Sequence, residues 1–118
     1  MDLQTRIKEI REHLSDTDDM AVLTDWHQSL AADKAWYGAE LAKLKQARGP
    51  KRLEIKKRLI QENGKATESE VEGEYYATEE GQWDAYYTEL LRHISPLIEA
   101  VKIKRQALSQ PTITGGYN

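Results

Sequence analysis

Apolar side chains recur along most of this chain at alternating intervals of four and three residues. Near the N-terminus four aliphatic residues follow this spacing: Leu3, Ile7, Ile10 and Leu14. The spacing places them on one stripe of a short amphipathic helix over residues 2 to 14. The next stretch, residues 15–19, is rich in Ser, Thr and Asp, which are preferred at helix N-caps. We therefore expect a turn there, followed by a second helix.

The second helical stretch carries a seam with the same spacing and two polar members, namely Leu23, His27, Leu30, Lys34, Tyr37, Leu41 and Leu44. Such a seam is typical of helices that pack on other helices. Gly49-Pro50 predicts a break or a kink, because the residue before proline avoids the α region and proline suits the first turn of a new helix. A separate helix over residues 50–62 should then end at Asn63-Gly64, a common C-terminal cap.

The last part of the chain holds the strongest periodic signal. Thr67-Glu68-Ser69-Glu70 fits the capping-box pattern, so the acidic stretch 66–80 is expected to be a short helix or an ordered loop. Pro96 should kink the final helix without ending it. Across it the four-three spacing is kept by eight residues: Trp83, Tyr87, Leu90, Ile94, Leu97, Val101, Lys104 and Leu108.

Two long helices joined by a turn region are expected to fold back on each other. The sequence thus predicts an all-α fold, a long antiparallel helical hairpin with a short N-terminal helix, in a single domain over residues 1–108. Residues 109–118, with Pro111 and two glycines, predict a flexible C-terminal tail. Aromatic residues off the main seam leave apolar surface that a second copy would cover, so we expect a helical oligomer, with a ring as one form. The predicted contacts between copies lie on the assembly helix 79–108: Trp83, Tyr87, Leu90, Ile94, Leu97 and Val101.

Composition narrows the classes of function. The 118 residues include no Cys, which excludes a disulfide framework, a thiolate nucleophile and a Cys-based zinc site. The first residues lack the basic and apolar regions of a signal peptide, and no apolar run approaches the roughly 18 residues of a membrane helix. These observations favour a cytoplasmic protein without a membrane partner, in the host cell cytoplasm if a phage encodes it.

Residue types that carry catalysis are not grouped along the chain. Glu9 with His13, and Glu89 with His93, share a helix face, but a zinc site needs at least three converging ligands. His27 lies on the second seam, where a buried or interfacial polar residue fixes register. There is no phosphate-binding glycine loop and no serine with a nearby histidine and carboxylate. We therefore expect no enzyme, no catalytic residue, no metal and no cofactor.

Charge is distributed unevenly, although the net charge is only -3. Residues 43–65 contain nine basic residues against two acids, which gives +7, whereas residues 66–91 contain eight acids and no basic residue. A cluster of Lys and Arg is the electrostatic footprint of nucleic-acid binding. The alternative interpretation is a solvated face that pairs with the acidic stretch.

The run Ile55-Lys56-Lys57-Arg58-Leu59 lies in a helix that follows a Trp-containing helix and precedes a polar loop. This order resembles the phage UvsY-type recombination mediators and their Lys-x-Arg-Leu element, and Ala100-Val101-Lys102 is similar to an Ala-apolar-Lys stretch of that family. The resemblance covers residues 20–108 as a pattern. It implies a helical, ring-forming accessory protein that binds single-stranded DNA beside a single-strand binding protein and helps a recombinase load. On that basis Lys56 and Arg58 match the DNA-contacting pair.

Two functions therefore remain open. The first is a single-stranded DNA-binding recombination mediator that acts as a homo-oligomer, with a recombinase and a single-strand DNA-binding protein as partners by resemblance. Its predicted nucleic-acid-binding residues are Lys51, Arg52, Lys56, Lys57 and Arg58. The second is a non-enzymatic phage protein-interaction or anti-host factor, in which the basic and acidic segments pair between subunits and nucleic acid plays no part.

Overall fold

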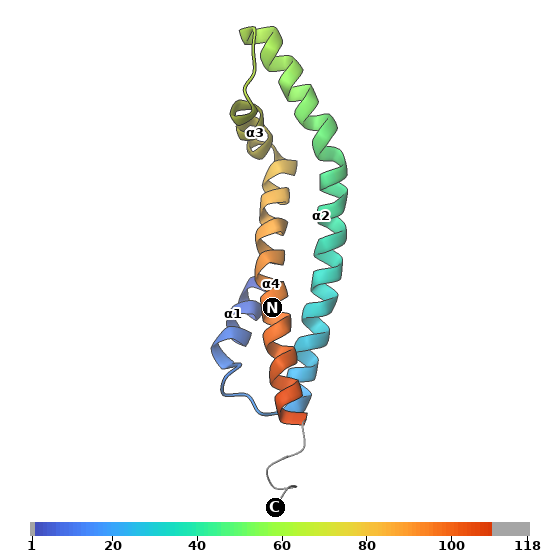
Figure 1. Cartoon of the computed structure of the whole chain (residues 1–118), viewed down its shortest axis with the longest axis vertical. Coiled ribbons are helices and arrows are strands. Elements are labelled where there is room, and N and C mark those ends of the chain that lie inside the picture. The colour runs from blue at the N-terminus through green and yellow to red at the C-terminus, as the bar shows by residue number, and fades with distance from the viewer. Residues whose placement is uncertain (1, 110–118) are drawn as a thin grey trace, which may run out of the picture. The chain divides into compact units, whose positions relative to one another are not determined.

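The computed structural model describes residues 2–109 of the chain. In this part 89% of the residues are helical and no strand is present, so the predicted all-α class is confirmed. The predicted tail, residues 109–118, lies outside the described residues apart from Ser109. Four helices follow in order, α1 Leu3–His13, α2 Met20–Asn63, α3 Glu68–Ala77 and α4 Glu79–Ser109 (Figure 1).

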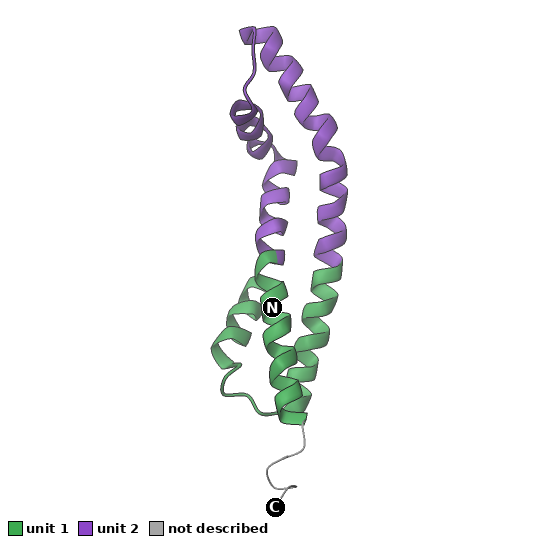
Figure 2. Cartoon of the chain, in the orientation of Figure 1, with its two compact units in different colours: residues 1–35, 92–118 green, residues 36–91 purple. Residues whose placement is uncertain are grey.

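The chain divides into two compact units (Figure 2). Unit 1 combines residues 1–35 with residues 92–118, and unit 2 comprises residues 36–91. The long helices α2 and α4 each contribute to both units, whereas α1 belongs to unit 1 and α3 to unit 2. Within each unit the α2 and α4 segments run in opposite directions (Figure 1).

Unit 1 buries aliphatic side chains from all three of its helical segments. The short helix α1 has its N-cap at Asp2, whose side chain accepts a hydrogen bond from the backbone N–H of Thr5. Arg6 then ties α1 to α2, because its guanidinium donates to Asp33 and to Ser29. The stripe expected in the sequence is buried on α1, and the same unit buries residues of α2 and α4: Leu3, Ile7, Ile10, Leu23, Leu30, Ile94, Leu97 and Val101.

Unit 2 has its own small core at the end of α2, where the helix packs against α3. Ile55 and Leu59 of α2 form a buried cluster with Val71 and Tyr75 of α3, and Ala66 packs against it. The two α2 residues are four positions apart and therefore share one helix face. Burying this face fixes α3 beside α2 and leaves the opposite face of α2 in solvent.

Of the break or kink expected at Gly49-Pro50, the break and the separate helix over residues 50–62 are wrong, since α2 continues through both residues as one helix of 44 residues. The kink stays a prediction. Proline costs one backbone hydrogen bond, but its clash with the preceding residue involves that residue's Cβ. Gly49 has no Cβ, so it avoids this part of the clash. The expected end is confirmed: α2 stops at Asn63, and Gly64 adopts a positive φ of 81°, as a glycine C-cap does.

Two threonines define the helix ends around α3. The side chain of Thr67 accepts a hydrogen bond from the N–H of Glu70, so the acidic stretch is a helix with the expected N-cap rather than a loop. Thr78 separates α3 from α4. Its N–H and hydroxyl both donate to the carbonyl of Tyr75, and its hydroxyl accepts from the N–H of Gly81. One residue thus ends α3 and caps α4.

Helix α4 continues through Pro96 to Ser109, as expected. The burial pattern departs from the predicted seam near its start. Trp83 is 46% exposed, whereas the neighbouring Asp84 is only 1% exposed. The buried stripe therefore runs from Leu90 back to Asp84 and Gly81 instead of to Trp83.

Among the described residues, no helix combines the length and the apolar character that crossing a membrane requires.

Candidate functional site

The five predicted DNA-binding residues all lie on the part of α2 that belongs to unit 2. Lys56 and Lys57 are exposed and have no ion pair among the described residues. The other three pair with acids of the same unit: Lys51 with Glu80 at 3.7 Å, Arg52 with Glu68 at 3.3 Å, and Arg58 with Glu74 at 2.8 Å and Glu62 at 3.4 Å.

These pairs are exposed and therefore weak. The acid that pairs with Arg52 is 81% exposed, and both partners of the Arg58–Glu74 pair are nearly half exposed. Exposed ion pairs contribute about 0.2–1 kcal/mol and are screened by salt. Phosphate groups can replace such partners at small cost, so the pairs reduce the positive potential of the segment without removing it.

The two unpaired lysines lie on the outer face of α2. Leu53, Lys56, Lys57 and Ile60 follow a three-one-three spacing that puts them on one side of the helix. All four are exposed, because the core of unit 2 lies against Ile55 and Leu59 on another side. We name this set the outer face of α2. It presents two adjacent cations on a regular helix, flanked by two exposed aliphatic side chains.

A buried carboxylate links the three helices of unit 2. Asp84 of α4 accepts three hydrogen bonds from the guanidinium of Arg48, from Nε to Oδ2 at 2.9 Å and from Nη2 to both Oδ1 and Oδ2 at 2.6 Å. The hydroxyl of Tyr75 on α3 donates to the same carboxylate at 2.7 Å. The Asp84 side chain is thereby satisfied although it lies out of water. We call these three residues the Asp84 cluster.

The surroundings of Asp84 hold it in the charged form. Burial on its own raises the pKa of a carboxyl group, but the hydrogen bonds from Arg48, Tyr75 and Thr88 and the charge of Arg48 outweigh that effect, so the pKa of Asp84 is lowered. The pKa of Tyr75 is raised by burial and by its hydrogen bond to Asp84. The cluster therefore contains a carboxylate, a guanidinium and a neutral phenol at neutral pH.

The lowered pKa of Asp84 predicts a pH-dependent stability. An unfolded Asp has a pKa of about 3.9, so the contribution of Asp84 is complete above that pH and is lost as the pH falls towards the lower folded value. We expect the difference in unfolding free energy between the wild type and Asp84→Asn to be largest at pH 5–7 and to shrink below about pH 4. Urea denaturation across this pH range measures it. A difference that stays constant below pH 4 would contradict the assignment, and Glu72→Gln, at an exposed unpaired acid, is the control.

A cluster of aromatic rings lies on the surface of unit 2, where α2 and α4 run side by side. Trp83 stacks on Tyr87, with ring centroids 5.5 Å apart, and Tyr86 lies 5.8 Å from Trp83. Tyr87 also contacts Tyr37 and Trp36 of α2 at 5.4 Å and 6.4 Å. Trp36, Trp83 and Tyr86 keep 55%, 46% and 39% of their surface exposed. We call these five residues the aromatic surface.

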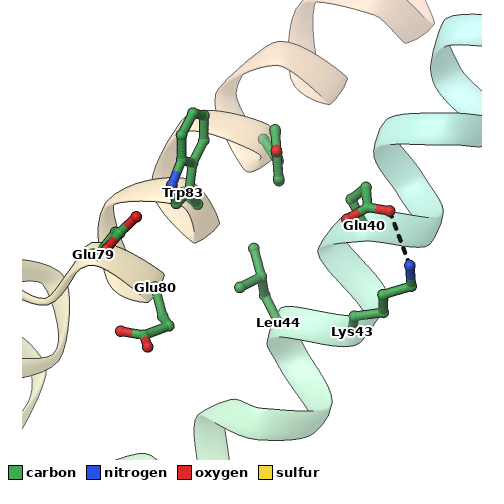
Figure 3. A pocket seen from close by; sticks show the side chains of 7 residues that line it. Glu40, Lys43, Leu44, Glu79, Glu80 and Trp83 are labelled. Carbon is green, nitrogen blue, oxygen red and sulfur yellow. Dashed lines mark hydrogen bonds and ion pairs between the residues drawn. The ribbon is translucent and has the colours of Figure 1, made fainter.

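The aromatic surface borders an open pocket of about 390 Å³. The lining comprises Trp83, Glu79, Glu80 and Tyr87 of α4 with Leu44, Lys43 and Glu40 of α2. Figure 3 shows Leu44 extending toward α4, whereas Lys43 is turned toward Glu40. Lys43 and Glu40 pair with each other at 3.0 Å. Glu79 has no ion pair among the described residues. The pocket thus combines an indole ring with an excess of carboxylates.

The predicted contacts between copies fall into two groups. Leu90, Ile94, Leu97 and Val101 are buried within a single copy, where they form part of its core. Trp83 is accessible and Tyr87 is half-buried. Of the six predicted contacts, Trp83 and Tyr87 are therefore the two that the fold leaves open to another molecule.

The described residues contain no group of three or more His, Asp or Glu side chains arranged to hold a metal ion. Two of the histidines considered in the sequence are engaged by arginines. Nδ1 of His27 lies 2.5 Å from the guanidinium of Arg105, and Nδ1 of His93 lies 2.9 Å from that of Arg11.

Comparison of the chain with protein-family models, with curated proteins and with solved structures gave no match.

Proposed function

We propose that this protein binds single-stranded DNA through the basic part of α2 and acts, as a homo-oligomer, as a mediator that helps a recombinase load on DNA covered by a single-strand binding protein. The observation that carries the proposal is the outer face of α2, where Lys56 and Lys57 are exposed without an acidic partner among the described residues. The recombination role and the ring rest on the sequence resemblance to UvsY-type mediators.

Three features support DNA binding at this place. The segment 43–65 has a net charge of +7 and lies almost wholly within one continuous helix, so its cations are held in a regular array. The ion pairs of Arg52 and Arg58 are exposed and cost little to exchange for phosphate contacts. Contacts to the backbone of single-stranded DNA release counterions and favour binding at low salt. Such binding would have little sequence preference.

The outer face predicts a specific loss of DNA affinity on substitution. Lys56→Ala with Lys57→Ala should weaken binding of a labelled oligonucleotide about tenfold or more at low salt, because two phosphate contacts are lost. The slope of log affinity against log salt should also fall by about 1.4, at about 0.7 for each contact to a single strand. Fluorescence anisotropy over a salt series measures both quantities.

The matched control is Lys8→Ala with Lys102→Ala, which removes two exposed lysines of unit 1 that also have no ion pair among the described residues. Both doubles change the net charge equally. If the two doubles weaken binding to the same extent, the protein attracts DNA only through its overall charge, and the assignment to the outer face is wrong.

A protein-interaction factor that acts without nucleic acid is the second candidate. Two observations favour it: three of the five predicted DNA-binding residues are already paired with acids, and the aromatic surface is exposed. These ion pairs form within one copy, whereas the sequence prediction placed them between subunits. On this proposal the charged stretches stabilise unit 2 and the aromatic rings contact a partner. Absence of oligonucleotide binding at low salt, with the helical fold intact by circular dichroism, would favour this candidate over the first.

A further inference from the structure

The aromatic surface has the composition of a recognition site rather than of a core. Aromatic residues are enriched where proteins contact partners, and a few of them carry most of the binding energy. Here Trp36, Trp83 and Tyr86 form one connected cluster with two tyrosines and remain substantially exposed. Scattered exposed rings need no explanation, but three exposed rings that Tyr37 and Tyr87 join into one cluster favour a surface that a ligand covers.

The charges around Trp83 select the ligand. Three carboxylates line the pocket, and the single cation among the lining residues, Lys43, is occupied by Glu40. Glu80 is held only loosely by Lys51 at 3.7 Å, and Glu79 has no ion pair among the described residues. An indole face attracts cations through its quadrupole, and an adjacent carboxylate strengthens that attraction. Phosphate and carboxylate ligands are disfavoured by the same charges.

We propose that this pocket binds a lysine or arginine side chain presented by a basic segment of a partner protein, with Trp83 contacting the cation and Glu79 and Glu80 pairing with it. Neighbouring apolar side chains of the segment would cover Tyr86 and Trp36. On this proposal the contacts between copies in the proposed homo-oligomer lie outside the aromatic surface. The proposal does not depend on DNA binding, because Lys56 and Lys57 lie outside the pocket lining. It adds a second surface, of opposite charge, to the same unit.

The test uses a fluorescently labelled peptide of eight residues in which Lys and Arg alternate with Ala and Leu. The same peptide with Gln, or with Glu, at the charged positions serves as the comparison. We expect anisotropy to report binding of the basic peptide alone. Trp83→Ala should weaken it about fivefold, the equivalent of about 1 kcal/mol for one exposed cation–π contact. Glu79→Gln with Glu80→Gln should have a similar effect, since it removes two exposed ion pairs.

The control is Glu54→Gln with Glu72→Gln, which removes two exposed acids of unit 2 that do not line the pocket. Equal weakening by both acid doubles, or equal binding of the Gln peptide, would overturn the proposal. If circular dichroism shows that Trp83→Ala does not fold, the comparison of the two double substitutions of acids still tests the proposal. A second copy would be the occupant if the peptide does not bind and the mass of the protein rises with concentration in the wild type but not in Glu79→Gln with Glu80→Gln. That result would overturn the proposal of a partner protein.

Oligonucleotide affinity is measured in parallel on the same variants. We expect the pocket variants to bind the oligonucleotide at least as tightly as the wild type does, because the lysines of the outer face are untouched and Glu80→Gln releases Lys51. A pocket variant that loses peptide binding should retain DNA binding. The Lys56→Ala, Lys57→Ala double should lose DNA binding and retain peptide binding. The two measurements therefore test the pocket and the DNA-binding proposal separately.

Discussion

Arg48→Ala is expected to lower the free energy of unfolding by about 3–5 kcal/mol, the range found when one partner of a buried ion pair is removed. The reason is the 1% exposure of Asp84, whose carboxylate receives three hydrogen bonds from the guanidinium. Without Arg48 the carboxylate keeps, among the described residues, only its hydrogen bonds from the hydroxyls of Tyr75 and Thr88. A buried charge is then left without a counter-charge, and chemical denaturation followed by circular dichroism measures the loss.

The matched control for this prediction is Arg52→Ala, one helical turn further along α2. Arg52 also pairs with an acid, but Glu68 is 81% exposed, so the expected loss is below about 1 kcal/mol. The ratio between the two variants is the informative quantity. If Arg48→Ala costs no more than Arg52→Ala, the Asp84 cluster does not stabilise unit 2 in the way that its geometry indicates.

Gly81→Ala is expected to destabilise the protein by about 1–3 kcal/mol, as overpacking does. A Cβ at this position would overlap the backbone carbonyl of Tyr75 and lie 2.7 Å from the Cα of Tyr76. Because these are backbone atoms at the end of α3, no side-chain rotation relieves the overlap. The α3–α4 junction at Thr78 would have to open, which would also displace Tyr75 from Asp84.

Gly73→Ala supplies a control with the opposite sign. Gly73 lies inside α3, and a Cβ there meets no atom within 4 Å. Alanine is the better helix former by about 0.5–1 kcal/mol, so this variant should be more stable than the wild type. Thermal unfolding of the two variants compares identical chemical changes. Equal and opposite shifts are not required, but a stabilised Gly81→Ala would refute the close approach of α3 and α4.

The helical class and most helix ends were predictable because they depend on local signals. The stripe of α1, the cap at Thr67 and the glycine at position 64 each act within one or two turns, and all are found where expected. The prediction of a break at Gly49-Pro50 was wrong, and the spacing of the seam is consistent with a continuous helix. The four-three spacing continues from Leu44 through Arg48 to Ile55 without a change of phase, and Gly49, which has no Cβ, avoids part of the clash with Pro50.

The start of the α4 seam was misplaced because periodicity recognises apolar residues only. Trp83 and Asp84 are adjacent, and hydrophobicity assigns the core position to the tryptophan. The carboxylate takes that position instead, since Arg48 and Tyr75 satisfy it from two other helices. Such a partnership spans 36 residues along the chain, and no local spacing reveals it.

The positive charge of the candidate site could be predicted from the sequence, but the ion pairs that its cations form could not. The sequence identifies the +7 segment and the acidic stretch after it, yet it does not say which cations an acid reaches. The packing of α3 against α2 decides that. It brings Glu68 and Glu74 to Arg52 and Arg58 and leaves Lys56 and Lys57 on the outer face. The aromatic surface depends likewise on which rings α4 turns towards α2.

Binding of a labelled single-stranded oligonucleotide at low and moderate salt, with light scattering on the same sample, tests the central proposal most directly. We expect binding by a multimer at low salt that weakens steeply as salt rises, because contacts to the phosphate backbone release counterions. A folded protein that does not bind at low salt, or whose binding is insensitive to salt, would contradict it.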